Sequence, residues 1–550
     1  MFKKTQWAVI VGALTALFTA CNAPNTTDYG DISGVEEIAE PLAALATPPA
    51  FATGTLTVTL ASGETAIISK HAVSGNILVN DVFATGATAA AVKTVAITGA
   101  AGAETVIIDF ANGTFAPGTS SAPGISAAMG AGADVFKIRG ASTTADTITV
   151  GGTATAVDIA FNVDAYKDIA VTGSGTIALT FSLGGGNDVF NATAGTYGTG
   201  GSPFAGALTV YGGLGDDSLI GGNGNDTMYG DLGNDTMSGG NSATDLDVFN
   251  GGGGTDTVTY AARSASVFVT VGTGLADGGT DDGESGEGDD VKSDVEIVRG
   301  GSGADTFTGT TGDQTFYGGA GNDTFDMGLL ASTGAGNDAV YGEAGIDTVT
   351  YASRLEAVTV TMDLNVANDG NSTASETDNV HDDIENFICP TGAFVCTVTG
   401  NGLDNSITGG GGADVLSGGA GDDKFIMGAN GTIGAGADSC TGGAGLDTVD
   451  FTNFGAVINV IMDGTASTTM SKVINTDVEN LTCPSASACT VTGNAAANRI
   501  VGSSAADTIT SLGGDDFIET SGGNDTVDCG DGSDILYFTM GTPVPTACEL

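Results

Sequence analysis

A nine-residue repeat that begins at Gly212 constrains this chain more than any other feature of its sequence. Written in nines, the stretch from Gly212 to Thr259 reads GGLGDDSLI, GGNGNDTMY and GDLGNDTMS, and after an insertion the pattern returns as GGGGTDTVT. The shared pattern is Gly-Gly-x-Gly-x-Asp-x-apolar-x. Self-similarity at a fixed short period predicts a solenoid, in which each repeat packs mainly against its neighbours.

Each repeat divides into a turn and a short strand. The Gly-Gly-x-Gly-x-Asp segment forms the turn, because glycines accept positive φ and let backbones approach closely. The other three residues form a strand whose middle side chain points inward, and these inward residues are Leu219, Met228, Met237, Phe249 and Val258. Two repeats make one coil of about 18 residues. The predicted fold class is therefore all-β, a parallel β-roll or β-solenoid.

Stacking coils about 4.8 Å apart places every second aspartate of the repeats in one column. Asp217, Asp235 and Asp256 fall on one edge, and Asp226 and Asp247 fall on the other. Each repeat buries a single apolar side chain, which offsets little of the entropy lost on ordering nine residues. The stacked carboxylates also repel one another. A cation between the turns removes that repulsion, and a set of about six to eight oxygen ligands suits Ca²⁺ better than Mg²⁺.

Residues 212–238 match one family motif at nearly every position, and the run resembles the RTX, or haemolysin-type, calcium-binding repeats. The resemblance implies a parallel β-roll with rows of Ca²⁺ between the turns, held by aspartate carboxylates and turn carbonyls. A disordered Gly/Asp-rich tail is the alternative, and the apolar residue at every inward position disfavours it. The residues that the resemblance assigns to the metal in this run are Gly212, Gly215, Asp217, Gly221, Gly224, Asp226, Gly230, Gly233, Asp235, Asp247, Gly251 and Asp256.

A longer unit, consisting of a repeat turn, an acidic loop and a DVEI, DIEN or DVEN element, occurs three times. Equivalent turns begin at Gly251, Gly342 and Gly442. On this basis we divide the repeat region of the chain into three units, 206–341, 342–441 and 442–550. Gln314 and Asn405 replace aspartate, so we expect weak metal binding or none at those two turns. The further expected metal ligands are Asp305, Asp323, Asp347, Asp414, Asp423, Asp447, Asp507, Asp516, Asp525 and Asp534.

The acidic loop differs between the three copies. It is dense in the first copy, thinner in the second and nearly lost in the third. Both extra Ca²⁺ sites and a solvated surface loop are compatible with this pattern. Its residues are Asp277, Asp281, Asp282, Glu284, Glu287, Asp289 and Asp290 in the first copy, and Asp369, Glu376 and Asp378 in the second.

The cysteines indicate local disulfides. Cys389 with Cys396, and Cys483 with Cys489, occupy equivalent places in the second and third copies, and in an exported chain such pairs favour small disulfide loops. Cys529 with Cys548 would close the C-terminal tail onto the last coil, which leaves Cys440 unpaired. Zinc is a poor alternative, because neither local pair has C-x2-4-C spacing and the chain has 2 histidines.

The N-terminus is typical of an exported lipoprotein. Residues 1–20 combine Lys3 and Lys4 with a short apolar run and small residues before the cut, which predicts a signal peptide. Cys21 at the cut resembles a lipobox and implies lipidation, whereas simple secretion is the alternative. Residues 21–51 form the expected flexible tether. We therefore expect an extracellular or outer-membrane surface location, with membrane contact only through the lipid on Cys21.

Residues 52–205 carry eroded fragments of the same pattern. They include GADVF at 132–136, ADTI at 145–148 and GNDVF at 186–190. We interpret this region as a degenerate part of the same solenoid, with a separate β-sandwich domain as the alternative.

Composition narrows the function. The 66 acidic and 14 basic residues give a net charge of −52, which disfavours nucleic acid and anionic membranes as partners. His71 and His381 are both expected at the surface, or near metal for His381, and no catalytic motif is visible. We expect a non-enzymatic, calcium-dependent adhesion or cell-envelope module that binds surface glycans or proteins. The alternative is a carbohydrate-active enzyme, with paired carboxylates in a groove of the first half.

Overall fold

Every regular element of the described chain is a β-strand. The computed structural model describes residues 44–116, 118, 122–161, 167–193, 203–272, 282–285, 287–310, 312–327, 336–363, 367–371, 376–427, 436–466, 472–538, 544–546 and 548. The predicted signal peptide and Cys21 lie outside these residues, as do Asp277 and Asp281. No helix in the described ranges is long and apolar enough to span a membrane.

The chain divides into two units. The first contains residues up to Val258 together with Gly286–Val295, and the second contains Thr259–Ser285 together with Glu296–Leu550. The strands of the first unit are β1 (Ala50–Ala52), β2 (Thr55–Thr59), β3 (Thr65–Lys70), β4 (Asn76–Val79), β5 (Val82–Thr88), β6 (Thr94–Thr98), β7 (Thr105–Asp109), β8 (Ile125–Gly130), β9 (Ala133–Arg139), β10 (Thr147–Thr153), β11 (Ala156–Phe161), β12 (Ile169–Gly173), β13 (Thr176–Gly185), β14 (Val189–Asn191), β15 (Leu208–Leu214), β16 (Ser218–Ile220), β17 (Thr227–Leu232), β18 (Thr236–Ser238), β19 (Val248–Gly253), β20 (Thr257–Thr259) and β23 (Asp290–Val291).

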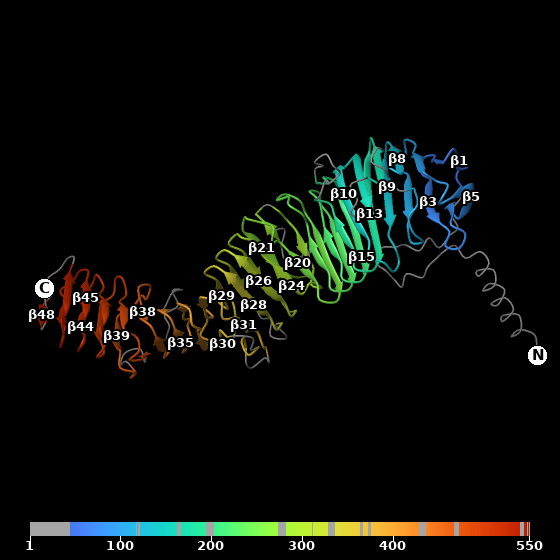
Figure 1. Cartoon of the computed structure of the whole chain (residues 1–550). Coiled ribbons are helices and arrows are strands. Elements are labelled where there is room, and N and C mark those ends of the chain that lie inside the picture. Colours follow the sequence, from blue (N-terminus) through green and yellow to red (C-terminus); the bar gives the residue numbers. More distant parts are fainter. Residues whose placement is uncertain are drawn as a thin grey trace, which may run out of the picture. The chain divides into compact units, whose positions relative to one another are not determined.

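The first unit is a two-sided roll. On one side the strand order is β1-β2-β6-β8-β12-β11-β10-β14-β16-β18-β20, and on the other it is β23-β19-β17-β15-β13-β9-β7-β3-β4-β5 (Figure 1). Repeats two apart pair in parallel, so that Leu219 lies opposite Met237, and Met228 opposite Phe249. The predicted inward residues are all 0% exposed, which confirms the period-nine β-roll.

The degenerate first half belongs to the same solenoid. Strand β13 pairs in parallel with β9 on one side and with β15 on the other. Strand β14 likewise links β10 to β16. The ladders therefore run from the eroded coils into the repeats, and the β-sandwich alternative is wrong. Antiparallel pairing is confined to insertions and to the N-terminal end, where β1 covers β2 and the β3-β4-β5 meander closes the other side.

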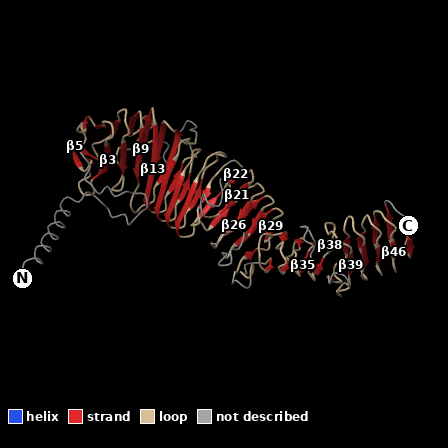
Figure 2. Ribbon diagram, turned by 180° about the vertical axis from the view of Figure 1, so that it is seen from behind, coloured by secondary structure: helices blue, strands red, loops and turns tan. Residues whose placement is uncertain are grey.

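The second unit continues the same coil geometry. Figure 2 shows its described elements as strands joined by loops. They are β21 (Val267–Thr270), β22 (Gly283–Glu284), β24 (Ile297–Arg299), β25 (Thr306–Thr308), β26 (Thr315–Ala320), β27 (Thr324–Asp326), β28 (Ala339–Ala344), β29 (Thr348–Thr350), β30 (Val358–Thr361), β31 (Asn379–Val380), β32 (Asn386–Ile388), β33 (Cys396–Thr399), β34 (Ser406–Thr408), β35 (Val415–Ala420), β36 (Lys424–Ile426), β37 (Ser439–Ala444), β38 (Thr448–Asp450), β39 (Ile458–Ile461), β40 (Val473–Ile474), β41 (Asn480–Thr482), β42 (Cys489–Thr492), β43 (Arg499–Val501), β44 (Thr508–Thr510), β45 (Phe517–Thr520), β46 (Thr526–Asp528), β47 (Ile535–Phe538) and β48 (Val544–Thr546).

Its longest ladder has the order β22-β21-β25-β27-β29-β32-β34-β36-β38-β41-β43-β45-β47. All of its pairs after β21 are parallel. The opposite side carries β24-β26-β28-β31, then β30-β33-β35-β37-β40, and then β39-β42-β44-β46-β48. The second and third copies of the long unit are equivalent in detail, because the Gly342 N–H donates to Asp383 and the Gly442 N–H donates to Asp477.

Three disulfides fasten the second unit. The structure joins Cys389 to Cys396, Cys483 to Cys489, and Cys529 to Cys548, which are the pairs expected from the sequence. Cys440 is a buried free thiol in β37, between Leu416 and Ile474 of the neighbouring strands.

Candidate metal centre

The aspartates of the repeats are buried. None of the aspartates expected to bind metal is more than 3% exposed, although each lies in a surface turn. Each aspartate immediately precedes the first residue of a strand. Its side chain turns back over the glycines of its own turn and is covered there. An ideal Cβ on Gly212 would lie 2.3 Å from Asp217 Oδ2, and one on Gly230 would lie 2.3 Å from Asp235 Oδ2. In these two turns the missing side chain of the first glycine makes room for the carboxylate.

Backbone hydrogen bonds link the aspartates of one edge into a column. In the first unit, the Asp188 N–H donates to Asp217 Oδ1 at 2.7 Å, and the Asp217 N–H donates to Asp235 Oδ1 at 2.7 Å. The Asp235 N–H continues the series to Asp256 Oδ1 at 2.8 Å. The predicted stacking of Asp217, Asp235 and Asp256 is present, and Asp188 extends it into the degenerate half. On the opposite edge, the Asp226 N–H donates to Asp247 Oδ1 at 2.8 Å.

One column of the second unit crosses all three copies of the long unit. Asp305, Asp323 and Asp347 are linked by the same N–H to carboxylate bonds, of 2.7 and 2.8 Å. The Asp347 N–H then donates to Glu385, a residue of the DIEN element. Strand register places the column members in the order Asp305, Asp323, Asp347, Glu385, Asn405, Asp423, Asp447, Glu479, Asn498, Asp516 and Asp534.

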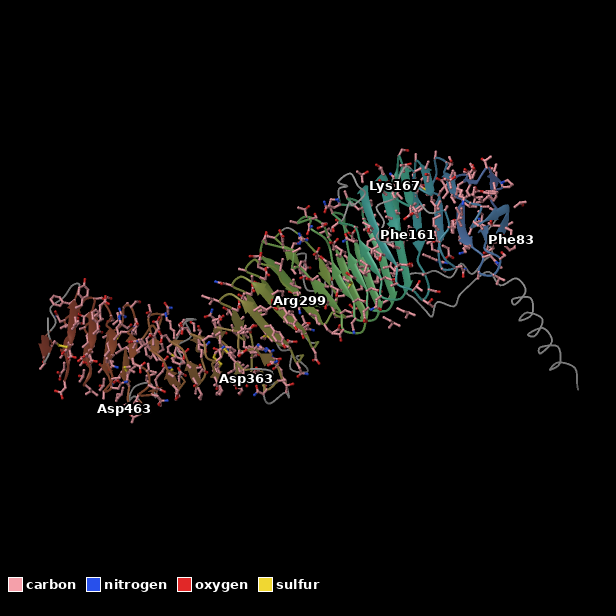
Figure 3. All side chains as sticks on the ribbon, viewed as in Figure 1. Phe83, Phe161, Lys167, Arg299, Asp363 and Asp463 are labelled. Carbon is pink, nitrogen blue, oxygen red and sulfur yellow. A yellow bond between two sulfur atoms is a disulfide. The ribbon has the colours of Figure 1, made fainter. Side chains whose placement is uncertain are left out.

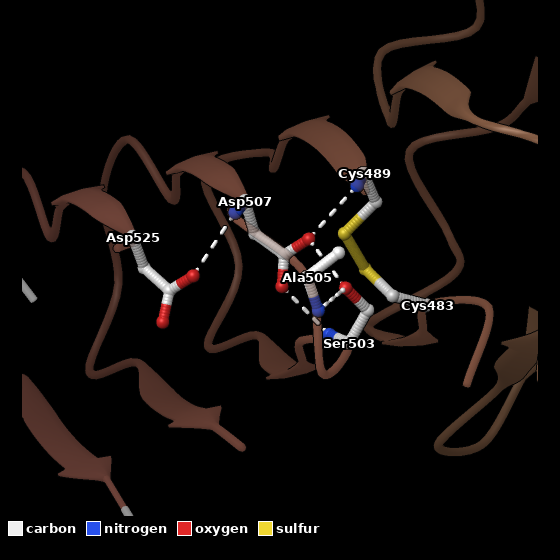
Figure 4. The surroundings of a disulfide bond; sticks show 6 residues. All are labelled: Cys483, Cys489, Ser503, Ala505, Asp507 and Asp525. Atoms are coloured by element: carbon white, nitrogen blue, oxygen red, sulfur yellow. Dashed lines mark hydrogen bonds between the residues drawn. A yellow bond between two sulfur atoms is a disulfide. The ribbon is translucent and has the colours of Figure 1, made fainter. Parts of the chain in front are cut away.

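The second carboxylate oxygen separates two kinds of turn. In capped turns it accepts an N–H of its own turn: the Gly222 N–H donates to Asp226 Oδ2 at 2.7 Å, and the Gly301 N–H to Asp305 Oδ2 at 2.8 Å. Figure 4 shows the capped turn of Asp507, with bonds from Cys489 and Ser503. In open turns Oδ2 is buried and has no hydrogen-bond partner. The open group includes Asp188, Asp217, Asp235, Asp247, Asp323, Asp347, Asp423, Asp447, Asp525 and Asp534.

Backbone conformation explains the difference. In most open turns the second residue has positive φ, as at Gly213 (108°), Asp231 (71°) and Gly319 (102°), whereas in the turn of Asp525 the second residue, Ser521, lies outside the left-handed region. That conformation rotates the peptide so that its N–H no longer faces the carboxylate. Gly222 and Gly301 lie outside the left-handed region, and their N–H groups reach the aspartate. Open turns therefore leave a charged oxygen in the interior without a donor, and such a group requires an external counter-charge.

Asparagine breaks the second-unit column at two equivalent points. The Asn405 side-chain N–H group donates to the carbonyl of Glu385 at 3.3 Å, and the Asn498 group donates to that of Glu479 at 3.0 Å. Each amide therefore supplies hydrogen-bond donors to carbonyl oxygens that a cation would otherwise coordinate. Gln314 is buried and accepts the Thr310 N–H at 3.2 Å, as in a capped turn. Weak or absent metal binding at Gln314 and Asn405 stays a prediction.

In the second and third copies, buried basic side chains supply counter-charge from the protein itself. The buried Arg354 guanidinium contacts Glu376 at 2.6 and 3.1 Å and donates to the Met327 carbonyl. In the third copy Phe454 replaces that arginine, and Lys472 contacts the Asp438 carboxylate instead. Lys472 occupies the column place that Asp378 holds in the second copy. Both copies therefore contain a buried positive charge, but Arg354 and Lys472 lie at different positions of the long unit.

The acidic loops do not form the solvated surface that was one alternative. Asp369, Glu376 and Asp378 are at most 5% exposed, and Asp282, Glu287 and Asp289 are at most 7% exposed. Asp369 accepts the N–H groups of Thr361 and Val380, and the Tyr351 hydroxyl donates to Asp378 at 2.7 Å. These residues fold into the roll as an additional rung, because their backbone pairs with the preceding coil. His381, from the same loop, is half-buried against Tyr341, and His71 packs on Phe83.

Several members of the columns were not predicted from the repeat pattern. Asp338 and Asp438 follow the segments GAGN and GAGA, which lack only the first glycine of the motif and keep the Gly-x-Gly-x-Asp-x-apolar spacing. That spacing could have found them. Glu385 and Glu479 belong to the DIEN and DVEN elements, where glutamate reaches the place of the aspartate, and only strand register reveals this.

Burial raises the pKa of Asp217, Asp235 and Asp247 when no metal is present. The pKa of Asp217 is raised to about 8, that of Asp235 to about 7 and that of Asp247 to about 10, with neighbouring carboxylates adding to the effect of burial. Backbone N–H donors oppose the shift but do not cancel it. The columns therefore favour occupancy by a positive charge, either a proton or a metal ion.

A scan against protein families matches the RTX calcium-binding nonapeptide repeat (4 copies) at residues 209–243, 296–329, 331–349, 399–430, 434–449, 492–527 and 513–542. The chain carries RTX calcium-binding repeats. The matches at 331–349 and 434–449 include Asp338 and Asp438. A search of curated proteins finds no match for the chain.

The RTX turns fit calcium. Within the described residues, no three His, Cys, Asp or Glu side chains converge on one point, so each turn offers one carboxylate together with backbone oxygens. The unpartnered Oδ2 atoms are hard, anionic ligands, which suit Ca²⁺. Bound calcium would supply the positive charge that these buried oxygens lack. Asp217, Asp235, Asp323, Asp347, Asp423 and Asp447 would hold it in the open turns.

Asp235→Ala should lower the melting temperature of the calcium-loaded protein more than Asp305→Ala does. Asp235 has an open Oδ2 in the middle of a column, whereas Asp305 Oδ2 already accepts the Gly301 N–H. Differential scanning calorimetry with and without calcium measures the difference. The calcium-induced rise in melting temperature should shrink for Asp235→Ala and persist for Asp305→Ala. Equal losses in the two variants would contradict the distinction between open and capped turns.

Calcium and protons should compete for the open carboxylates. In the metal-free protein the folded-state pKa of Asp217 is about 8 and that of Asp235 about 7, above the ordinary value of 3.8. Their contribution is therefore fully present below about pH 4 and is lost as the pH rises through 7 to 8. We expect metal-free stability to fall over that interval and calcium affinity to rise. Calorimetric titration in buffers of different ionisation enthalpy should detect proton release on calcium binding, and a pH-independent affinity would contradict this.

Proposed function

We propose that this chain is an exported, non-enzymatic adhesion or cell-envelope module that calcium folds outside the cell and that Cys21 anchors to a membrane. The observation that supports a calcium-gated module is the series of buried, unpartnered carboxylate oxygens in the open turns. Such columns are destabilising where calcium is scarce and become stabilising where it is abundant. A chain of this kind remains unfolded during export and folds at the cell surface.

Aligned aromatic side chains on the outer face support binding to a surface ligand. Tyr317 and Tyr341 stack at 4.7 Å, and His381 follows at 4.5 Å from Tyr341. The Arg299 guanidinium lies 3.7 Å from the Tyr317 ring centroid and begins the row, and Arg299 itself is labelled in Figure 3. In the first unit Tyr211 and Tyr229 stack at 4.6 Å. Partly exposed rings with hydroxyl groups can contact both the apolar faces and the hydroxyls of sugars.

Retention on immobilised cell-envelope polysaccharide tests the proposal. We expect the mature protein to be retained in calcium and released by chelator. Tyr317→Ala with Tyr341→Ala should abolish retention without altering the calcium-bound melting temperature. Tyr537→Ala, which removes an exposed tyrosine from the C-terminal edge, is the matched control and should be retained. Failure of the wild-type protein to bind any envelope glycan or surface protein would overturn the adhesion role.

A carbohydrate-active enzyme remains the second candidate, and its test is the release of reducing ends from the same polysaccharides. It requires two carboxylates about 5 Å or 6.5–9.5 Å apart in an open groove. Glu104 and Asp134 come together in the first half, but each is 1% exposed. No substrate can reach that pair, so the observation does not favour the enzyme.

A further inference from the structure

We propose that Glu104 and Asp134 form a divalent-cation site of their own in the N-terminal coils, outside the matched repeats. Glu104 immediately precedes β7, and Asp134 lies at the start of β9, the neighbouring strand. The Glu104 N–H donates to Asp134 Oδ1 at 3.0 Å, which fixes the two residues on adjacent rungs. Both side chains belong to the first unit, and the RTX family match begins only at residue 209.

Both carboxylates are buried and incompletely partnered. Glu104 and Asp134 are each 1% exposed, and neither oxygen of Glu104 forms a hydrogen bond of good geometry, although the backbone groups of Gly102 and Ala100 lie close enough to interact with its carboxylate. Asp134 Oδ2 forms no hydrogen bond of good geometry either. The ion pairs of these coils lie elsewhere, since Arg139 pairs with Asp109, and Lys167 pairs with Asp158. Two adjacent buried carboxylates without a basic neighbour require a positive charge between them.

A backbone oxygen completes a cradle for that charge. An ideal Cβ on Gly99 would lie 2.4 Å from the Met129 carbonyl oxygen and 3.1 Å from Glu104 Oε2. Both oxygens therefore border the space that glycine leaves open. With the Asp134 carboxylate on the adjacent rung, the groups available to a cation here are all oxygen atoms. Hard oxygen donors of this kind select Ca²⁺ or a similar divalent ion.

The site is separate from the RTX columns. Strand register places Phe136, Leu179 and Leu208 in line with Asp226, because β9, β13, β15 and β17 pair in parallel. Asp134 lies two residues before Phe136 in the chain, and so two residues before the register position of Asp226. Three apolar residues therefore separate the Glu104 pair from the nearest aspartate column on its edge. The cation would join two coils that are otherwise held together by their apolar core. This proposed site does not depend on the proposed adhesion role.

A shared proton is the competing explanation, and Glu104→Gln distinguishes it from a metal ion. Glutamine keeps the shape of the side chain and can donate to Asp134 as a protonated acid would. If a metal holds the site, native mass spectrometry of the mature chain in calcium should show one fewer ion in Glu104→Gln. Hydrogen exchange at 99–110 and 128–136 should slow on calcium addition in the wild type and should lose that response in the variant.

Glu64→Gln is the matched control. Glu64 occupies the same register position one coil earlier, but its carboxylate accepts the N–H groups of Ala61 and Ala46 at 2.6 Å. We expect no change in ion count for this variant. An unchanged ion count and an intact calcium response in Glu104→Gln would overturn the proposal, as would a wild type whose 99–110 amides ignore calcium. Should Glu104→Gln fail to fold, Asp134→Asn and the wild-type exchange response decide the question.

Discussion

Removal of calcium is expected to unfold the repeats between Gly212 and Thr259. These coils have three-residue strands such as β16 and bury a single apolar side chain per repeat, while Asp217, Asp235 and Asp247 each bury an unpartnered carboxylate oxygen. A site filled at a hundredfold excess over its Kd contributes about 2.7 kcal/mol, so loss of several sites removes more stability than a typical domain has.

Hydrogen exchange with mass spectrometry measures this effect segment by segment. Amides of β16, β17 and β18 should lose protection in excess chelator. Those of β13 should lose less, because this strand has ten residues and alternates buried Leu179, Phe181 and Leu183. Addition of calcium should restore protection, whereas magnesium should not, because Mg²⁺ prefers fewer ligands in a strict octahedron. A metal-free protein with unchanged exchange and circular dichroism would contradict the central role of calcium.

Replacement of Arg354 by methionine is expected to lower the free energy of unfolding by about 3–5 kcal/mol, which is the usual cost of removing one partner from a buried ion pair. Arg354 and Glu376 are both 1% exposed at the side chain and lie 2.6 Å apart. Asp338 and Asp378 are buried nearby, and the Arg354 charge lowers the pKa of both carboxyls against the larger effect of burial. Without the guanidinium, three acidic groups lose their only described internal counter-charge.

Chemical denaturation of the calcium-loaded protein measures the loss. Arg299→Met is the matched control, because Arg299 pairs with Glu343 at 3.7 Å with both side chains more than 40% exposed. It should change stability by less than about 1 kcal/mol. The double variant Arg354→Met with Glu376→Gln should recover part of the stability, because it removes the unpaired charge. Equal effects of Arg354→Met and Arg299→Met would show that Arg354 does not act as a protein-supplied cation.

Much of the fold can be predicted from the residue types of the repeat. A nine-residue period with glycines in the turn and one apolar side chain per strand has few other ways to bury that side chain. The inward residues Leu219, Met228 and Phe249 follow from it, and so does the stacking of Asp217 on Asp235. The disulfide pairs also follow, because Cys389 and Cys396, and Cys483 and Cys489, are close in sequence and hold equivalent places.

Only the tertiary structure decided which carboxylates remain open. Asp226 and Asp235 stand in nearly identical repeats, yet the Gly222 N–H caps one, and positive φ at Asp231 leaves the other open. The burial of Asp369 and Glu376, and the pairing of Glu376 with Arg354, likewise depend on how a loop folds back onto its coil. The nine-residue period determines the order in which coils stack, because each coil packs against the coils next to it in the sequence. Charge balance is set by peptide orientation and by residues 20 to 40 positions apart, such as Arg354 with Glu376 or Asp438 with Lys472, which the period does not specify.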